Sequence, residues 1–390
     1  KNNPIYTAHS YHTKVPHPAI MRYILKYTQP GDIVFDGFCG TGMTGVAAQE
    51  CEKPDQSIKF KIENEFKQNS NLGIKWGERK AICSDLSSFA TFLSNSYNSP
   101  TDLIKFKKDA NDVFSKVNSA CSWMYETKHV NGKLGFLNYV VWSDVYECSN
   151  CFHELVYWDL AVDTSNASII DDVNCPSCQQ INKIKSLNRV FTTINDEFSD
   201  EIRKKAKQVP VLKYYTCNGK KYLEKIDKFD LEIIQKVENT AITNSVASIK
   251  LPDGYNTRQP IRSHGFEFVH DFYTKRNVLT LNLFREEIYK SGNSKLLFLL
   301  TGMTVRSTMM NRIHLKNFVF GGGGWNAGHR KGTLYMPSIS IETSPLVQFL
   351  DKVKSAINAF SLTKDFRSTI STNSATQIPI ESETIDFMYL

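Results

Sequence analysis

The sequence has no apolar run approaching the roughly 18 residues that a membrane-spanning helix needs. It also has no signal-peptide pattern, no internal repeat and no low-complexity tract. These absences argue against membrane, secreted and solenoid proteins, so we expect a cytoplasmic protein without a membrane partner. At 390 residues and 41% hydrophobic content, the chain exceeds one ordinary domain and can bury more than one core.

Nine cysteines give no obvious disulfide framework, but four of them form two C-x-x-C pairs separated by 23 residues. Four thiolates at this spacing are typical of a structural, tetrahedral zinc with no open position. The residues are Cys148, Cys151, Cys175 and Cys178. We predict a zinc ribbon over residues 145–182, with a hairpin strand at Glu154–Trp158. Disulfides are the competing interpretation, and they are disfavoured in the cytoplasm.

The most informative motif is the apolar run Ile33–Asp36 followed by a loop with Gly40, Gly42 and Gly45. It predicts a strand, a tight turn and a helix N-terminus that binds a nucleotide cofactor. The G-x-G-x-x-G pattern alone would suit a dinucleotide. The aromatic Phe38 inside the loop favours the methionine moiety of S-adenosylmethionine instead. A glycine turn without a ligand is the remaining alternative.

A second acidic residue, Asp85, follows the short predicted strand Ala81–Cys83. A carboxylate that ends the second strand of such a sheet accepts hydrogen bonds from ribose hydroxyls. The polar residues 51–78 look like an insert, which explains why Asp85 lies further from the glycine loop than the usual spacing of about 20 residues. Helix capping is the alternative role for Asp85.

Upstream of the glycine loop, residues 11–18 precede a predicted helix at Ala19–Tyr27. This segment and residues 36–42 resemble motifs X and I of the DNA amino-methyltransferases that modify N6 of adenine or N4 of cytosine. The resemblance implies that Thr13 and Lys14 contact the cofactor carboxylate, although Lys14 alone would also suit the surface. The cofactor-binding residues that it implies are Thr13, Lys14, Asp36, Phe38, Gly40, Thr41, Gly42, Asp85 and Ser374.

The resemblance extends to the C-terminal residues, where Ser374–Pro379 is similar to the third motif near the cofactor adenine. In the family, a strand like Ile385–Leu390 then delivers the tetrapeptide Asp/Asn/Ser-Pro-Pro-Tyr/Phe. No Pro-Pro dipeptide occurs in the sequence. We therefore expect the catalytic residues just after Leu390, name none here, and expect an N-terminal portion that transfers no methyl by itself.

These motifs predict a split α/β domain over residues 1–115 and 362–390, with a Rossmann-like methyltransferase sheet that is incomplete at its C-terminus. Residues 120–360 are expected to be a large α+β insertion that recognises the target. Its expected elements are strands at 209–215 and 334–341 and helices at 272–290, 294–313 and 345–360.

The insertion is basic in two stretches. Residues 183–228 hold twelve lysines and arginines against six acidic residues, and residues 258–331 hold twelve against four. This distribution favours a phosphate backbone as partner, with ordinary solvated surface as the alternative. The four glycines before Trp325 predict a mobile loop that either orders on DNA or serves as a connector.

The expected function is therefore methyl transfer from S-adenosylmethionine to an exocyclic amine of adenine or cytosine, as in restriction-modification systems. The expected partner is double-stranded DNA with the target base flipped out. Two other classes stay open at this point: an RNA amino-methyltransferase, and a non-catalytic nucleic-acid-binding protein that retains a cofactor fold.

Overall fold

The structure is a computed structural model that describes residues 3–69, 73–242, 246, 248–363 and 365–389. The chain divides into two compact units. Unit 1 comprises residues 1–112, 292–302 and 351–390, and unit 2 comprises residues 113–291 and 303–350. Residues 292–302 thus belong to unit 1, although the sequence placed them in the insertion. No helix of the described residues is both long and apolar enough to cross a membrane.

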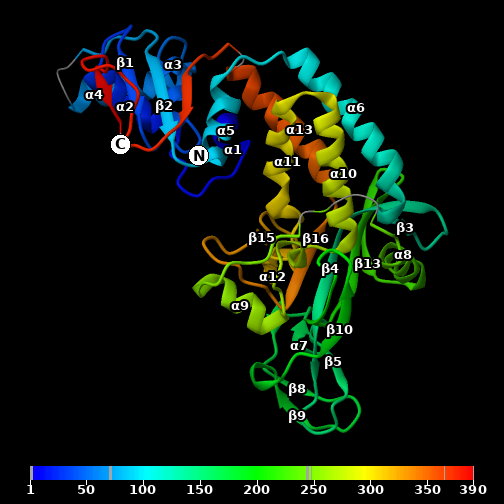
Figure 1. Cartoon of the computed structure of the whole chain (residues 1–390). Coiled ribbons are helices and arrows are strands. Elements are labelled where there is room, and N and C mark those ends of the chain that lie inside the picture. The colour runs from blue at the N-terminus through cyan, green and yellow to red at the C-terminus, as the bar shows by residue number, and fades with distance from the viewer. Residues whose placement is uncertain (1–2, 70–72, 243–245, 247, 364, 390) are drawn as a thin grey trace. The chain divides into compact units, whose positions relative to one another are not determined.

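Unit 1 contains a four-stranded sheet in the order β17-β2-β1-β18, and its three strand pairs are all parallel (Figure 1). The strands are β1 Ile33–Asp36, β2 Lys80–Asp85, β17 Thr369–Thr372 and β18 Phe387–Met388. Continuous apolar residues such as Val34 and Phe35 suit a parallel sheet that is buried on both faces, and both are buried.

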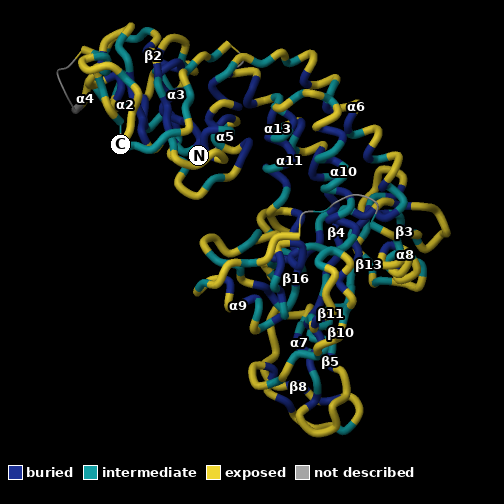
Figure 2. Tube along the Cα trace, in the orientation of Figure 1, coloured by how far each residue is buried: buried dark blue, intermediate teal, exposed yellow. Residues whose placement is uncertain are grey.

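The helices of unit 1 differ in burial (Figure 2). They are α1 Pro4–Thr7, α2 His17–Tyr27, α3 Met43–Glu50, α4 Gln56–Asn69 and α5 Ser88–Asn98. Every residue of α3 is buried, including the polar Thr44, Gln49 and Glu50 near small apolar residues of the same helix. In contrast, α4 lies in the predicted insert, and most of its described side chains are at least partly exposed.

Three helices contribute residues to both units: α6 Leu103–Cys121, α11 Leu297–Thr304 and α13 Pro345–Thr363. The predicted helix at 294–313 is wrong beyond Thr304. There the chain forms a 3-10 turn and then β14 Arg312–Ile313. The side-chain amide of Asn311 donates hydrogen bonds to the backbone carbonyls of Arg306 and Thr308. These carbonyls therefore have partners without a continuing helix.

Unit 2 is built on an antiparallel sheet with the strand order β13-β12-β4-β16-β14-β15, and β3 and β5 also pair with β4. Its strands are β3 Glu126–Lys128, β4 Leu134–Glu147, β5 Glu154–Val156, β12 Gln208–Cys217, β13 Lys220–Lys225, β14, β15 Asn326–Gly328 and β16 Ile339–Thr343. The predicted strand at 334–341 therefore begins later, after Pro337, whose ring removes a backbone donor.

Two-stranded hairpins and shorter helices complete unit 2. The hairpin strands are β6 Val162–Asp163, β7 Ser168–Ile169, β8 Asp172–Asn174, β9 Ile181–Lys183, β10 Phe191–Asp196 and β11 Glu201–Ala206. The helices are α7 Tyr157–Ala161, α8 Lys228–Glu238, α9 Tyr255–His264, α10 Lys275–Ser291 and α12 Leu315–Phe320. The strand predicted at 154–158 ends at Val156, because α7 starts at Tyr157 and its Trp158 packs into the core of the sheet.

Candidate cofactor pocket and metal centre

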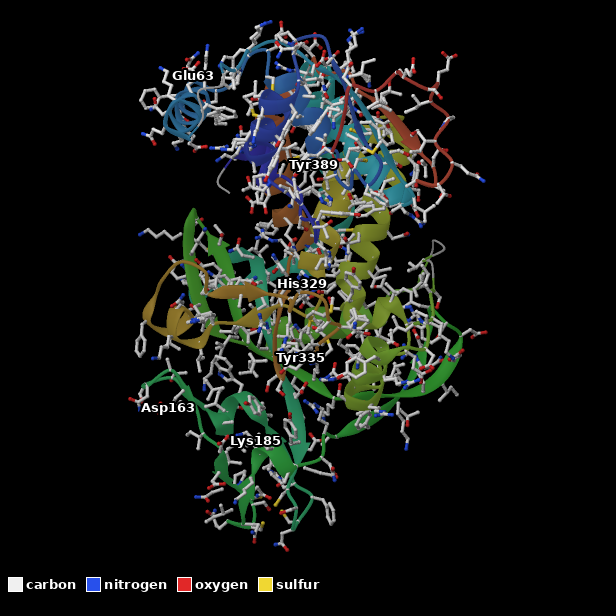
Figure 3. All side chains as sticks on the ribbon, turned by 90° about the vertical axis from the view of Figure 1, so that its left-hand side faces the viewer. Glu63, Asp163, Lys185, His329, Tyr335 and Tyr389 are labelled. Atoms are coloured by element: carbon white, nitrogen blue, oxygen red, sulfur yellow. The ribbon has the colours of Figure 1, made fainter. Side chains whose placement is uncertain are left out.

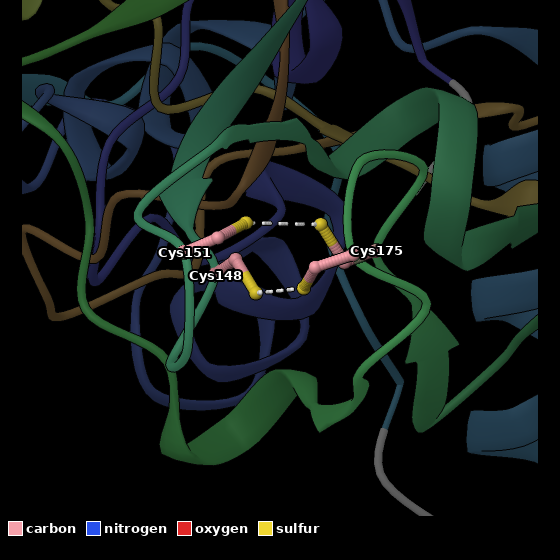
Figure 4. Close-up of side chains that lie close together, drawn as sticks. Cys148, Cys151 and Cys175 are labelled. Carbon is pink, nitrogen blue, oxygen red and sulfur yellow. Dashed lines mark hydrogen bonds between the residues drawn. The ribbon is translucent and has the colours of Figure 1, made fainter.

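The four cysteines of the two C-x-x-C pairs come together at the tips of two hairpins (Figure 4). Cys148 Sγ lies 3.7 Å from Cys178 Sγ, and Cys151 Sγ lies 3.6 Å from Cys175 Sγ. Zinc with four thiolates at about 2.3 Å places the sulfurs about 3.8 Å apart, whereas a disulfide needs about 2.05 Å. The arrangement therefore fits a tetrahedral metal and not a disulfide.

The two knuckles repeat the same backbone geometry. The residue after each second cysteine, Phe152 or Gln179, has a positive φ of 59° or 62°. In both knuckles the amide of this residue donates to the carbonyl of the first cysteine, at 3.1 Å and 2.9 Å. Such turns direct backbone N–H groups at the sulfurs, and those from Cys151 and Asn150 lower the pKa of Cys148 to about 6. The thiolate form that a metal requires is thus favoured at Cys148.

The glycine loop after β1 adopts the tight turn that its sequence predicts. Gly40 and Gly42 have φ of +50° and +70°, a region that costs other residues free energy. At Gly42, a Cβ would stand 2.1 Å from Ser94 Oγ and 2.7 Å from Asn98 Nδ2. Gly42 is therefore required for the packing of the loop against α5.

Asp36 orders this loop from beneath. Its Oδ2 accepts a hydrogen bond from Thr44 Oγ1 at 2.5 Å, and its Oδ1 accepts one from the Phe38 amide at 3.0 Å. Asp36 is only 6% exposed, and burial raises its pKa despite these hydrogen bonds. The structure therefore gives Asp36, which was predicted to bind the cofactor, a positioning role within the loop.

Asp85 joins the ends of three neighbouring strands. Its two carboxylate oxygens accept hydrogen bonds from the amides of Gly40 and Ser87, both at 2.9 Å. Its carbonyl accepts a hydrogen bond from the Asn373 amide, which follows β17. Asp85 is partly exposed, and each carboxylate oxygen keeps a lone pair for a further donor. Both interpretations of Asp85, capping and ligand binding, are compatible with this geometry.

Phe38 and Thr41 belong to the same loop, but the side chain of Phe38 is exposed and that of Thr41 is buried. The Phe38 side chain is 68% exposed, while Thr41 is 2% exposed and its Oγ1 has no hydrogen-bond partner in the described part of the chain. Thr13 is exposed, and no described hydrogen bond fixes its side chain. An exposed phenyl ring and an unsatisfied buried hydroxyl are features that a ligand would complete.

Lys14, which the resemblance assigns to the cofactor carboxylate, contacts oxygens of the protein itself. Its ammonium lies within hydrogen-bond distance of the carbonyls of Ile5, Tyr6 and His9 and of the Tyr97 hydroxyl, at 3.0–3.4 Å. Three hydrogens are thus shared among four protein oxygens, which leaves none for a cofactor carboxylate. Burial lowers the pKa of Lys14 to about 7. In this arrangement Lys14 anchors the N-terminal segment.

Three further residues complete the surroundings of the loop. Ser374 follows β17 and is partly exposed, with its Oγ 2.8 Å from Thr376 Oγ1. Tyr11, which the residue pattern did not single out, lies against Gly40, where an added Cβ would be 3.3 Å from its ring. Tyr389 extends β18, and its amide donates to the Phe35 carbonyl at 2.9 Å.

With this geometry described, the chain can be compared with known proteins. Residues 1–72 match the family model described as DNA methylase. The match covers β1, the glycine loop and α3, and it supports a DNA methyltransferase family at this coarse level. Neither the curated proteins nor the solved structures gave a significant match. Asp85, Ser374 and the four cysteines lie outside the residues matched to DNA methylases.

Beyond the DNA methylase match, unit 2 contains a cavity of about 390 Å³ that the sequence did not reveal. Arg203 lies in its wall and is 9% exposed. Its guanidinium donates to Asp196 at 2.6 Å and to Asp271 at 2.8 Å. Arg203 belongs to the basic stretch 183–228, which the sequence was expected to direct toward a phosphate backbone. The structure contradicts that role, because two carboxylates neutralise its charge inside the unit.

This cavity wall also resembles a metal site, because Asp196, His270 and Asp271 have possible ligand atoms within 4.8 Å of one another. However, the guanidinium of Arg203 already occupies the space between both carboxylates. Burial opposes ionisation of Asp271, but the hydrogen bond from Arg203 and the charges of Arg203 and Lys205 outweigh it and lower its pKa. The cluster is therefore a neutralised charge network and not a cation site.

Proposed function

We propose that this protein is an S-adenosylmethionine-dependent DNA amino-methyltransferase in which unit 1 binds the cofactor and unit 2 recognises DNA. The observation that carries the proposal is the glycine loop within the residues matched to DNA methylases. Asp36 and Gly42 order the loop, whose Gly40 amide donates to Asp85 and whose Phe38 ring is exposed.

The sheet of unit 1 supports a Rossmann-like methyltransferase assignment. Counted along the chain, its four strands have the order 3-2-1-4, which is the order around the switch point of doubly wound sheets. In such sheets ligands bind beyond the carboxyl ends of the strands where the order reverses. Here that point lies between β1 and β18, next to the glycine loop and Tyr389.

Each residue of the proposed pocket has a distinct task. Phe38 would pack on the cofactor, and the free lone pairs of Asp85 would accept the ribose hydroxyls. Thr41 offers an unsatisfied hydroxyl, and Ser374 approaches from the end of β17. When bound, S-adenosylmethionine supplies an electrophilic methyl group. The chain's own contribution is to hold that group in place and to orient an incoming amine toward it.

The target amine belongs to a stacked base, so the proposal includes flipping of adenine or cytosine out of the duplex, at a cost of a few kcal/mol. The metal centre would be a structural zinc that holds the two hairpins of the ribbon, because four thiolates leave no open position. It would take no part in methyl transfer.

Isothermal titration calorimetry with the purified chain tests the proposal. We expect S-adenosylmethionine and S-adenosylhomocysteine to bind, and NAD to show no binding under the same conditions. Binding of NAD instead would identify a dinucleotide site and contradict the proposal. Tighter binding of RNA than of duplex DNA by the same protein would favour an RNA amino-methyltransferase.

A further inference from the structure

Unit 2 contains a segment with no negative charge to offset its positive charge. The sequence has no aspartate or glutamate from residue 288 to residue 341. Within this stretch, β14, α12, β15 and the following loop to Tyr335 form what we call the basic hairpin, residues 312–335. Its cationic residues are Arg312, Lys316, Arg330 and Lys331, and it also carries His314 and His329.

The cations of the basic hairpin have no acidic partner among the described residues, whereas several other basic residues of unit 2 are paired. Lys316, Arg330 and Lys331 are exposed, and none forms an ion pair with any described residue. By contrast, Lys213 lies 2.6 Å from Asp227, and Arg276 forms a buried ion pair with Glu342. Much of the charge that the sequence assigned to a nucleic-acid surface is thus neutralised internally, whereas the charge of the basic hairpin is not.

The basic hairpin is anchored at its base and open at its tip. Arg312 pairs with Gly328 and Ile313 with Asn326, and the His314 amide donates to the Trp325 carbonyl at 2.7 Å. The Trp325 ring packs 4.6 Å from that of Tyr139, so this residue is held by the sheet core and is not a free aromatic on a loop.

Between these anchors, the Gly321–Gly324 loop exposes its backbone. A Cβ added to Gly321, Gly323 or Gly324 would meet no atom within 4 Å. Phe320 at the start of the loop is 63% exposed, and Tyr335 at the end of the segment is 38% exposed. Figure 3 labels Tyr335 together with His329 of the same segment. Cations, open backbone amides and exposed rings are the groups that contact phosphates and sugars in protein–DNA interfaces.

We propose that the basic hairpin binds the phosphate backbone of double-stranded DNA through Lys316, Arg330 and Lys331. In this arrangement the Gly321–Gly324 loop follows the duplex surface. This inference rests on the proposed function, which supplies DNA as the substrate. The positive charge of the basic hairpin is not offset by any acidic residue of its own segment, whereas β13, another exposed basic element, carries Glu224 and lies at a sheet edge. Edge strands commonly use lysines to prevent pairing with other chains.

The test compares two triple variants that each remove three exposed positive charges from unit 2. The first is Lys316→Gln/Arg330→Gln/Lys331→Gln. The matched control is Lys220→Gln/Lys221→Gln/Lys225→Gln on β13, whose three lysines are also exposed. Fluorescence anisotropy of a labelled duplex is measured at several salt concentrations, and metal content together with circular dichroism verifies that both variants fold.

We expect the hairpin variant to bind DNA on the order of tenfold to a hundredfold more weakly at low salt. The slope of log K against log [salt] should become shallower by about 3, roughly one per lost phosphate contact. The control should stay within about twofold of the unaltered protein. Equal affinity of the hairpin variant, or an equal loss in the control, would overturn the proposal.

Two further measurements separate this inference from the proposed function. Absence of DNA binding by the unaltered protein, or stronger binding to duplex RNA, would overturn the assignment of the hairpin to DNA. Calorimetry with S-adenosylmethionine on all three proteins tests the cofactor site independently. We expect equal S-adenosylmethionine affinity in the unaltered protein and both triple variants. If the unaltered protein did not bind S-adenosylmethionine, the proposed function would be contradicted, while the result on DNA binding by the basic hairpin would still hold.

Discussion

Two residues of the glycine loop, Asp36 and Phe38, are close in sequence but have opposite environments. Asp36 is buried beneath the loop and makes two hydrogen bonds there, whereas Phe38 projects from it. The resemblance implies that both contact the cofactor. The structure separates them, because only the exposed side chain is available to a ligand.

For Phe38→Ala we expect S-adenosylmethionine binding to weaken by about 1–3 kcal/mol, the range for loss of a packed aromatic ring and its apolar contact. The melting temperature should not change, because the ring is largely exposed. Phe60→Ala is the control, since Phe60 is 66% exposed on α4, away from the loop. Calorimetry and thermal melting measure both effects, and unchanged affinity in Phe38→Ala would refute this pocket.

Asp36→Ala should behave differently and destabilise unit 1 by about 1–3 kcal/mol, because the Thr44 hydroxyl and the Phe38 amide lose their acceptor. Cofactor affinity should fall as well, as a consequence of the disordered loop. Thermal melting distinguishes the two variants. A normal melting temperature combined with weak cofactor binding would restore Asp36 as a direct ligand.

His17 predicts a pH dependence of stability. It is completely buried, neither ring nitrogen has a hydrogen-bond partner among the described residues, and burial lowers its pKa to about 4. In the unfolded chain its pKa is about 6.5. Between these values only the unfolded chain takes up the proton, so the stability present above pH 6.5 is lost as the pH falls toward 4.

We therefore expect His17→Leu to reduce the fall in melting temperature between pH 7 and pH 5. The control is His12→Leu, because His12 is exposed. Melting curves of the three proteins at several pH values provide the measurement. An undiminished pH dependence in His17→Leu would assign the effect to other groups, such as His9, whose pKa burial also lowers to about 4.

At the scale of elements, the proposed zinc ribbon has few apolar contacts of its own. Its small cluster consists mainly of Tyr146, Leu155 and the cysteines themselves. Metal–ligand bonds must therefore offset the entropy of ordering the two hairpins. The Asn182 amide lies 3.6 Å from Cys148 Sγ, which is the type of outer contact that orients a metal ligand.

We expect elemental analysis to find about one zinc per chain, and Cys175→Ser to lose it. Cys217→Ser is the matched control, because Cys217 is a buried free cysteine of the same unit outside the cluster. Zinc in the control and none in Cys175→Ser would establish the ligand set. A disulfide among the four cysteines in the native protein would exclude it.

At the scale of the whole molecule, the two proposed activities lie in different compact units. The glycine loop, Asp85 and Ser374 belong to unit 1, while the cysteine cluster and the basic hairpin belong to unit 2. Damage to the ribbon should therefore leave the cofactor pocket intact.

Cys175→Ser should lose DNA affinity while it keeps S-adenosylmethionine affinity within about twofold. Anisotropy with duplex DNA and calorimetry with the cofactor, on the same preparation, measure the two activities. Parallel loss of both would mean that the units fold as one cooperative block.

The local motifs were well predicted because their geometry depends on neighbouring residues. Positive φ values follow from the glycines of the loop, and each C-x-x-C turn has the same local backbone geometry, with a positive φ after its second cysteine. The start of α13 at Pro345 and the strand within β12 likewise follow from local patterns. The match of residues 1–72 to DNA methylases covers the same local signal around the glycine loop.

What the sequence by itself determined is therefore the glycine loop, the two C-x-x-C turns and the alternation of strands and helices around them, since each depends on contacts within a few residues. The two turns meet only in the tertiary structure, because their paired sulfurs are 24 and 30 residues apart. Only the tertiary structure decided that Lys14 binds carbonyls near the N-terminus and that Arg203 pairs with Asp271, 68 residues away. A charged side chain takes whichever partner burial brings to it, because an unpaired buried charge is too costly. Sequence charge counts therefore indicated a basic insertion, but the fold determined that the unpaired cations of residues 312–335 lie at its surface.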